Sequence, residues 1–366
     1  MSHQLPETHS PAPAGHTRTA YSRASTRTNA HGSAEPALRI RKLVKDFRAS
    51  RSFREKHPER ITPMDFYRAV NSVNLDVYPG EVVVLLGANG AGKTTTLSCA
   101  QGMVWPTRGS VELLGENPVH ASPELRARVG IMLQDGGLPN AMKPIPLLKH
   151  VASMYRDPMD VDMLVERLGI EAFNGTNIRR LSGGQKQRVA FAAALIGKPD
   201  VLFLDEPSAG LDPQSRNVVF DIIREQRAAG TAIVLTTHLL DDAQKLADYV
   251  YIMEDGAIAS EGPIHQLLTG DGSMRLRFSL RSDCPELSEL FPDDLSKGLS
   301  LSVSEPYDES APLLPGEYEV TGAITGRHMV EFHRALAQRN LMPVHLELTA
   351  KSLEDVFLEI SGEEIR

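Results

Sequence analysis

One glycine-rich stretch sets the expectation for the whole chain, and it reads Gly87-Ala88-Asn89-Gly90-Ala91-Gly92-Lys93-Thr94. It has the spacing G-x-x-x-x-G-K-[ST], in which glycines let the backbone wrap closely around phosphate groups. Residues 81–86 before it are a short, β-branched apolar run, which predicts a buried parallel strand. Residues 95–100 after it can continue as a helix. Strand, loop and helix start together predict an anion site, because backbone N–H groups and the helix dipole converge there.

The residue types in this loop indicate that the anion is a polyphosphate. Lys93 is expected to reach the outer phosphates, and the Thr94 hydroxyl is expected to ligate Mg²⁺. The remaining contacts are expected from the loop and the first turn of the helix, namely Gly87, Asn89, Gly90, Ala91, Gly92 and Thr95. A plain glycine turn is the alternative. The presence of both Lys93 and Thr94 after an apolar strand argues against it.

Composition and charge narrow the class of protein. The 366 residues leave room for two or three domains, and 41% hydrophobic residues can build a real core. A net charge of −8 provides no overall basic field for nucleic acid. The sequence contains no run of eighteen apolar residues, so the chain is not expected to span a membrane by itself. Its two cysteines, Cys99 and Cys284, are far apart and are expected to be reduced thiols.

Changes in composition along the chain predict three segments. Residues 1–36 are rich in His, Ser, Thr, Pro and Ala and are expected to be disordered. Residues 37–270 carry alternating strand and helix patterns around the glycine-rich loop, with a helical subdomain at 135–190. Residues 271–366 contain segments in which apolar and polar residues alternate, together with helical segments, and this order predicts a small α+β accessory domain.

Polar residues follow three further apolar strands. Residues 201–204 lead into Asp205-Glu206-Pro207, residues 232–235 lead towards His238, and residues 129–133 end at Gln134. Open α/β sheets place their ligands at the carboxyl ends of parallel strands, so these groups are expected near the phosphates. The alternatives are an acid pair that caps a helix and a structural histidine.

A second glycine pair opens a long helix. It lies in Leu181-Ser182-Gly183-Gly184-Gln185, where Ser182 is a natural N-cap residue. Because a helix start attracts anions, this stretch is a second candidate phosphate site.

Taken together, these motifs resemble one family. Residues 38–266 are similar to the nucleotide-binding subunit of an ABC transporter. Residues 87–94 match its Walker A motif, 181–185 its LSGGQ signature, 201–206 its Walker B motif and 208–212 its D-loop. His238 matches its switch histidine and Gln134 its Q-loop glutamine. The resemblance implies a P-loop α/β fold with a mixed sheet, an antiparallel β subdomain and a helical subdomain.

The resemblance also implies roles for these residues. The cofactors are ATP and Mg²⁺, and the metal is held by Thr94, Gln134 and Asp205. The catalytic groups are Glu206, which orients or deprotonates the attacking water, with His238, Gln134 and Lys93. Positioning and charge neutralisation of this kind are most of what phosphoryl transfer needs.

In this family one chain holds only half of each ATP site. Two chains, identical or sister subunits, pair head-to-tail, and each signature closes on the γ-phosphate of the partner's nucleotide. The residues implied in that contact are Ser182, Gly183, Gly184, Gln185 and Asp212.

The residue that stacks on adenine is left between two aromatics. Phe47 follows the first strand in the pattern of the family and is favoured. Tyr67 is the alternative, because residues 48–63 are highly charged and look like an insertion.

The C-terminal end resembles a particular branch of the family. Residues 348–358 are similar to the tail of the daunorubicin-resistance type of ATPase, which drives ABC-2-type exporters. This implies a separate membrane permease, docked on the loop and helix over residues 136–156, from Gly136 to Arg156. It also implies a peripheral location at the cytoplasmic face of the cell membrane. The tail helix is expected to dock on its own chain or on the sister ATPase.

Two other functions remain to be compared with transport. A soluble ABC-type ATPase acting on nucleic acid or the ribosome would share the same core. This chain has one cassette, no heptad run and no cysteine cluster, so nucleic acid is not expected as a partner. A regulatory module that does not hydrolyse ATP is disfavoured by the intact Lys93, Asp205, Glu206 and His238.

Overall fold

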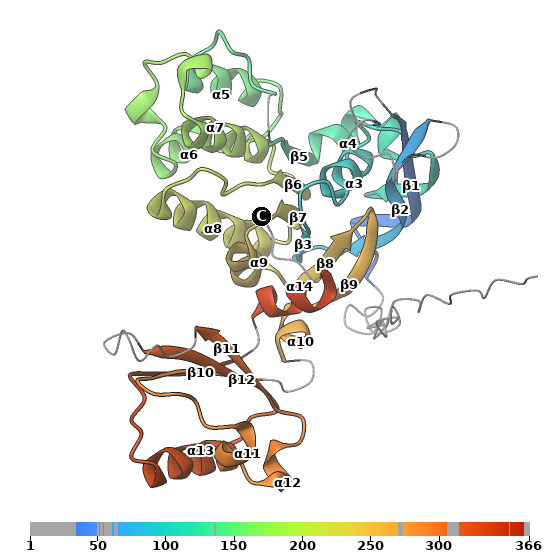
Figure 1. The fold of residues 1–366 in the computed structure, drawn as a ribbon. Helices are drawn as coiled ribbons and strands as arrows, with labels where there is room; N and C mark the ends of the chain where they lie inside the picture. The colour runs from blue at the N-terminus through green and yellow to red at the C-terminus, as the bar shows by residue number, and fades with distance from the viewer. Residues whose placement is uncertain are drawn as a thin grey trace, which may run out of the picture.

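A computed structural model describes residues 34–49, 51, 54, 61, 65–134, 137–269, 274–305, 315–350 and 352–361. The expected disordered tail over 1–36 and the charged insertion over 48–63 lie, apart from a few residues, outside the described residues. The described chain forms three sheets (Figure 1).

The central sheet has six strands in the order β5-β6-β7-β3-β8-β9. Its members are β5 (Val129–Met132), β6 (Val201–Asp205), β7 (Ala232–Thr237), β3 (Val82–Leu86), β8 (Tyr249–Glu254) and β9 (Ala257–Pro263). The first five run parallel and β9 is antiparallel to β8. The order places β3, which precedes the glycine-rich loop, next to β7.

Both faces of this sheet are covered, which explains why its strands are apolar throughout. Val82, Val84 and Leu86 of β3 belong to one hydrophobic cluster, whereas Val83 and Leu85 belong to another on the opposite face. Helices pack on the first face: α5 (Pro144–Ala152), α6 (Val161–Arg167), α7 (Gly183–Leu195), α8 (Pro213–Ala228) and α9 (Leu240–Leu246). Among the described residues, the 3-10 helices η2 (Pro118–His120), η3 (Glu171–Phe173) and η4 (Ile178–Arg180) lie in the connections between these elements.

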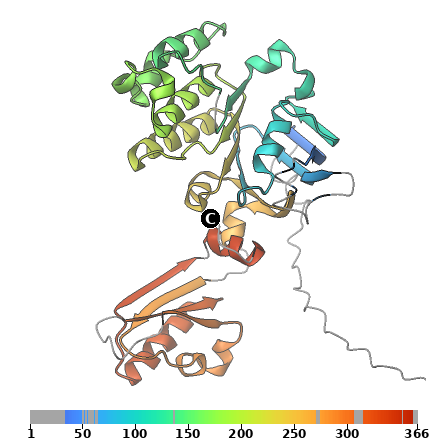
Figure 2. The same cartoon turned by 45° about the horizontal axis from the view of Figure 1, so that its top comes forward.

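The second face packs against a small antiparallel sheet in the order β2-β1-β4. Its strands are β1 (Leu38–Arg48), β2 (Phe66–Val77) and β4 (Arg108–Leu113), and the helices on this side are α3 (Lys93–Ala100) and α4 (Pro123–Ala127). Figure 2 shows this sheet on one side of the central strands and the helical subdomain on the other. The mixed sheet, the antiparallel subdomain and the helical subdomain confirm the predicted fold class.

The C-terminal part is a separate α+β unit that follows α10 (Ile264–Thr269). Its antiparallel sheet has the order β11-β12-β10-β13. The elements are β10 (Met274–Leu280), α11 (Leu287–Leu290), α12 (Asp293–Ser296), β11 (Ser300–Glu305), β12 (Gly316–Gly322), α13 (Gly326–Gln338) and β13 (His345–Ala350). Successive side chains of β10 point to opposite faces of this sheet, and Leu276, Phe278 and Leu280 lie on the face that covers the hydrophobic cluster of the C-terminal unit.

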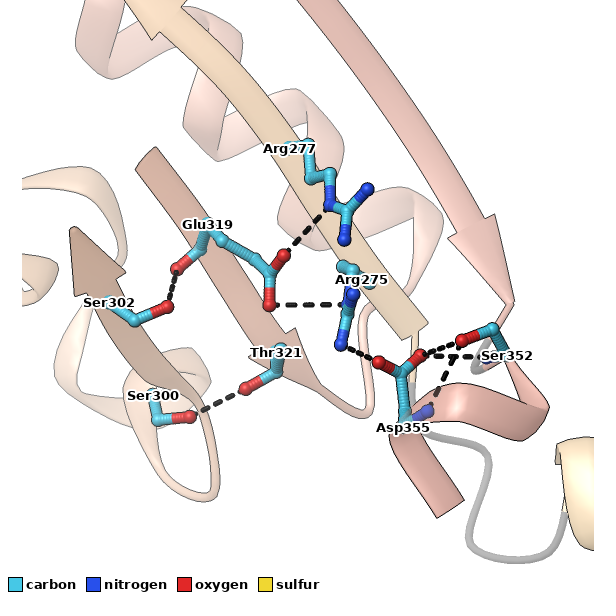
Figure 3. Close-up of polar contacts among 8 residues, drawn as sticks. All are labelled: Arg275, Arg277, Ser300, Ser302, Glu319, Thr321, Ser352 and Asp355. Atoms are coloured by element: carbon cyan, nitrogen blue, oxygen red, sulfur yellow. Dashed lines mark hydrogen bonds and ion pairs between the residues drawn. The ribbon is translucent and has the colours of Figure 1, made fainter. Parts of the chain in front are cut away.

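The opposite face of β10 carries charged side chains that reach the last helix, α14 (Leu353–Ser361) (Figure 3). Arg275 contacts Asp355, and its Nε lies 3.2 Å from an oxygen of Glu319. Arg277 donates to the other Glu319 oxygen at 2.9 Å. Asp355 in turn accepts from the backbone N–H of Ser352 at 2.7 Å. Ser352 and Asp355 therefore cap α14 reciprocally, and the Arg275–Asp355 pair connects the helix to the C-terminal sheet.

The apolar side of α14 returns to the nucleotide-binding domain. Leu353, Val356 and Phe357 are buried in the same cluster as the central strands, and α14 contacts α9 and α10. Figures 1 and 2 show the helix between the C-terminal unit and the rest of the chain. Of the two docking sites expected for the tail, the structure therefore shows the one on its own chain.

Truncating Phe357 is expected to release this helix. Phe357 is 4% exposed, and Phe357→Ala should cost about 3 kcal/mol, the usual loss for a buried aromatic ring. Hydrogen exchange of the α14 amides should then be about a hundredfold faster, as measured by mass spectrometry. The control is Glu354→Ala, at an exposed neighbour, where exchange should change far less. Unchanged protection in Phe357→Ala would show that docking does not depend on this ring.

Candidate nucleotide site

The carboxyl edge of the central sheet collects the predicted polar residues. Strands β5, β6, β7 and β3 are neighbours and run parallel, so the loops that follow them emerge at one edge. Gln134 follows β5, the pair Asp205–Glu206 lies at the end of β6, and His238 follows β7. The glycine-rich loop follows β3. Residues up to 151 positions apart along the chain therefore meet because of strand order.

The glycine-rich loop packs closely against the backbone of neighbouring segments. A Cβ on Gly87 would lie 2.4 Å from the carbonyl oxygen of Met253, and one on Gly92 would lie 2.5 Å from that of Ala69. Gly92 is also the N-cap residue of α3 with φ 100°, and within the described chain no side chain caps this helix start. The first N–H groups of α3 are thus left for an external acceptor.

Lys93 is held back against this loop. Its Nζ donates to the carbonyl oxygens of Gly87 at 2.7 Å and Ala88 at 3.1 Å. Burial lowers the pKa of its ammonium group, and the carboxylates of Glu206 and Asp205 act in the opposite direction. The cation therefore shares one electrostatic site with both acids. Asn89, Gly90 and Thr94 next to it are exposed, whereas Ala91 is buried and Thr95 is half-buried.

The two acids are buried at the end of β6. Asp205 is 3% exposed and accepts a hydrogen bond from the Thr236 hydroxyl of the neighbouring strand. Glu206 is 4% exposed, and its Oε1 lies 2.9 Å from Nδ1 of His238. Its Oε2 is buried with no hydrogen-bond partner within the described part of the chain. A buried carboxylate oxygen without a partner is costly, which fits a position that a water or ligand completes.

The structure thus brings His238 directly to Glu206 and leaves Gln134 less constrained. Gln134 is exposed and lies two residues beyond β5. Among the described contacts none joins its side chain to Asp205 or Glu206. Its metal and catalytic roles stay predictions.

The signature stretch forms the start of α7. Ser182 caps the helix: its hydroxyl accepts from the N–H of Gln185 at 3.2 Å, and the Gln185 side chain accepts from the N–H of Ser182 at 3.0 Å. Ser182 and Gly183 are exposed, while Gly184 packs so closely that a Cβ there would meet the carbonyl oxygen of Gly210 at 2.6 Å. The signature therefore rests on the D-loop and presents its first residues outward.

The D-loop ends at Asp212, the N-cap of α8. Its carboxylate accepts from the backbone N–H of Ser215 at 2.9 Å and from the Ser215 hydroxyl at 2.6 Å. These bonds, the hydroxyl first, lower the pKa of Asp212.

The two candidate adenine-stacking residues turn out to be partners. Phe47 of β1 pairs with Tyr67 of β2, and their ring centroids lie 5.7 Å apart with 26° between the planes. The Nζ of Lys45 lies 4.7 Å from the Phe47 centroid. That Phe47, and not Tyr67, stacks on adenine stays a prediction. The two rings lie side by side, so both alternatives refer to the same position on the protein.

Sequence reasoning missed several residues that hold the acids in place. Thr236 bonds Asp205, and the Gln187 side chain donates to the carbonyl oxygen of Glu206 at 2.5 Å. Asp242 of α9, 1% exposed, accepts from the Ser208 hydroxyl of the D-loop. Each of these polar residues lies at a position where the apolar periodicity of its helix or strand predicts a buried side chain. That mismatch could have identified them from the sequence.

The loop, the acid pair and the sheet order define a P-loop nucleotide-binding α/β protein. A family model described as "ABC transporter" matches residues 70–209. The Nod factor export ATP-binding protein I of Cupriavidus metallidurans is 35% identical over 207 residues, which cover 55% of this chain and 68% of that protein. A daunorubicin resistance ATP-binding protein of Streptomyces coeruleorubidus is 34% identical over 219 residues, covering 58% and 69%. The chain therefore belongs to the ABC transporter ATP-binding proteins and is an ABC-type ATPase.

Solved structures show the same fold. An ATP-binding subunit of an ABC transporter superposes with a TM-score of 0.55 at 24% identity, covering 64% of this chain and 92% of the other. The protein cbiO1 from Clostridium perfringens, part of the ABC transporter complex cbiONQ, has a TM-score of 0.50 at 28% identity and covers 64% and 90%. Within the described residues, no helix combines the length and apolar character needed to cross a bilayer.

Proposed function

We propose that this chain is the ATP-binding subunit of an ABC exporter and that it hydrolyses ATP to drive transport through a separate membrane permease. One observation carries this proposal. Lys93, Asp205, Glu206 and His238 meet at one sheet edge, with the free Oε2 of Glu206 buried among them. The name of the Nod factor export relative described above favours export as the direction.

In this proposal ATP binds along the glycine-rich loop with Mg²⁺. Gly87, Asn89, Gly90, Ala91, Gly92 and Thr95 surround the phosphates, and Lys93 neutralises the charge that develops during transfer. Among the described residues, no group of three or more His, Cys, Asp or Glu is placed to hold a metal ion. Mg²⁺ is commonly bound through one or two carboxylates together with substrate phosphates. Asp205 and Thr94 are its protein contacts, with Gln134 as a third.

Glu206 is the group that acts on the attacking water. Its buried Oε2 is available for that water, while its Oε1 is occupied by His238. His238 thereby fixes the direction of the carboxylate.

Each site is completed by a second ATPase subunit, identical or related. The exposed Ser182 and Gly183 start a helix of 13 residues and form an outward-facing anion site. With Gly184, Gln185 and Asp212, they are proposed to close on the nucleotide of the partner in a head-to-tail dimer.

The permease is proposed to dock on the helical subdomain over residues 136–156, of which Gly136 lies outside the described residues. This docking would put the chain at the cytoplasmic face of the membrane. Met154, just after α5, is 68% exposed, and an exposed large apolar side chain suits such an interface.

Purification of the full chain with its membranes in mild detergent tests the proposal. A membrane protein with several spanning helices should co-purify, and Met154→Glu should abolish its recovery without changing the ATPase rate of the isolated chain. Met342→Glu is the matched control, because Met342 is 84% exposed on the C-terminal unit and should leave recovery intact. Recovery of ribosomes or DNA instead would support a soluble ABC ATPase and contradict transport.

A further inference from the structure

Gln187 joins the signature helix to the backbone of the proposed catalytic carboxylate. It lies on α7 and is 8% exposed. Its side-chain Nε2 donates to the carbonyl oxygen of Glu206 at 2.5 Å. This hydrogen bond connects the signature helix with the end of β6. In the proposed ATPase, these two elements serve different ATP sites.

Glu206 needs support of this kind because its backbone conformation is unfavourable. Its φ of 53° lies in the left-handed region, which residues with a side chain rarely adopt. Its N–H donates to the carbonyl oxygen of Thr236 at 3.1 Å, and its carbonyl accepts from the N–H of Ala209 at 3.1 Å. Gln187 supplies the one side-chain bond to this carbonyl among the described contacts. Removing it leaves the carboxylate held by fewer constraints.

The other end of the connection is the anion site of the signature. Gln187 is four residues after Gly183, so about 6 Å of rigid helix separates them. A ligand that shifts the start of α7 therefore shifts the Gln187 amide as well. The exposed Gly183 faces outward, whereas the Glu206 carboxylate contacts His238 and acts electrostatically on Lys93 of its own chain.

We propose that Gln187 is a positioning residue for Glu206 and that it transmits the position of the signature helix to that carboxylate. This rests on the proposed head-to-tail dimer, in which the signature contacts the nucleotide of the partner. Closure at one ATP site then sets the carboxylate at the other. Gln187 works through the backbone of Glu206 and does not itself touch ATP.

Gln187→Met tests the positioning role, because methionine has a similar length and shape but cannot donate. We expect kcat for ATP hydrolysis to fall about tenfold, the factor that corresponds to about 1.4 kcal/mol for one hydrogen bond, with the KM for ATP unchanged. Gln101→Met is the matched control, since the Nε2 of Gln101 is buried without a hydrogen-bond partner in the described chain. Its kcat should stay within twofold of wild type.

Combining Gln187→Met with Glu206→Gln separates positioning from a general structural effect. If Gln187 acts through Glu206, the double variant should be no slower than Glu206→Gln alone in single-turnover assays. A further tenfold loss in the double variant would overturn the proposal, as would wild-type kcat in a folded Gln187→Met protein.

Gln187→Glu provides a second readout should the methionine variant fold poorly. An ionised glutamate cannot donate to the Glu206 carbonyl, but a protonated one can. Activity relative to wild type should therefore rise as the pH is lowered, whereas the ratio for Gln187→Met should stay constant. A constant ratio for both variants contradicts the proposal. If wild type and Glu206→Gln hydrolyse ATP equally well, the proposed role of Glu206 itself is wrong, and that outcome is distinct from these.

Discussion

Replacing Glu206 with glutamine should lower kcat for ATP hydrolysis by roughly 10²–10⁴-fold, the usual contribution of a general base. The amide keeps the size of the side chain but cannot accept a proton from water. The variant should still bind ATP, because the glycine-rich loop and Lys93 are unchanged. It should therefore accumulate as an ATP-bound dimer, visible as a shift in size-exclusion chromatography when ATP is present.

Glu81→Gln is the matched control for this experiment. Glu81 is also buried, at 5% exposed, and its Oε2 accepts from the N–H of Tyr78 at 3.0 Å. It precedes β3, so it lies at the opposite end of that strand from the glycine-rich loop. The glutamine can still accept through its own oxygen, and kcat should stay near wild type. Wild-type hydrolysis by Glu206→Gln would remove Glu206 from its proposed role.

The sequence was sufficient to predict the sheet edge but not the contacts across it. Each apolar strand followed by Asp205, His238 or Gln134 could be recognised locally, because the strand and its polar end are contiguous. The bonds from Thr236 to Asp205 and from Gln187 to Glu206 join residues 31 and 19 positions apart. They depend on β7 lying beside β6 and on α7 packing over β6, and neither fact is contained in the periodicity of one segment.

The same reason explains the two alternatives that the sequence left open. The apolar spacing of Leu353, Val356 and Phe357 predicts a buried face but does not specify its receiver, which proved to be the chain's own cluster. The sequence indicates that Phe47 and Tyr67 each lie close to a strand. Their stacking, however, follows from the register of β1 against β2. The local sequence pattern determines which face of an element is apolar. The tertiary arrangement of the elements determines which residues that face contacts.

Two substitutions should each abolish hydrolysis for different reasons. Lys93→Met removes the cation that shares the site with Asp205 and Glu206, and a loss of at least roughly a hundredfold is expected from removing such a charge. Gly183→Asp places a carboxylate in the signature anion site. A Cβ on Gly183 would meet nothing within 4 Å in the described structure, so the chain itself should fold normally. The carboxylate would repel the phosphate of the partner's nucleotide.

Mixing these two inactive proteins should restore activity if the dimer is head-to-tail. In a mixed dimer, one site receives both defects, and the other combines an intact P-loop with an intact signature. Half of the dimers in an equal mixture are mixed, and each has one intact site, so up to about a quarter of the wild-type rate should return. The recovered rate should be lower than that if Gln187 couples the two sites. Gly175→Asp is the control for added charge, because its Cβ is also unobstructed in the described chain and it lies outside the signature. It should be active alone. A mixture that stays inactive, although the variants exchange subunits, would mean that signature and P-loop do not meet between chains, whereas recovery would place the two halves of each ATP site on different subunits.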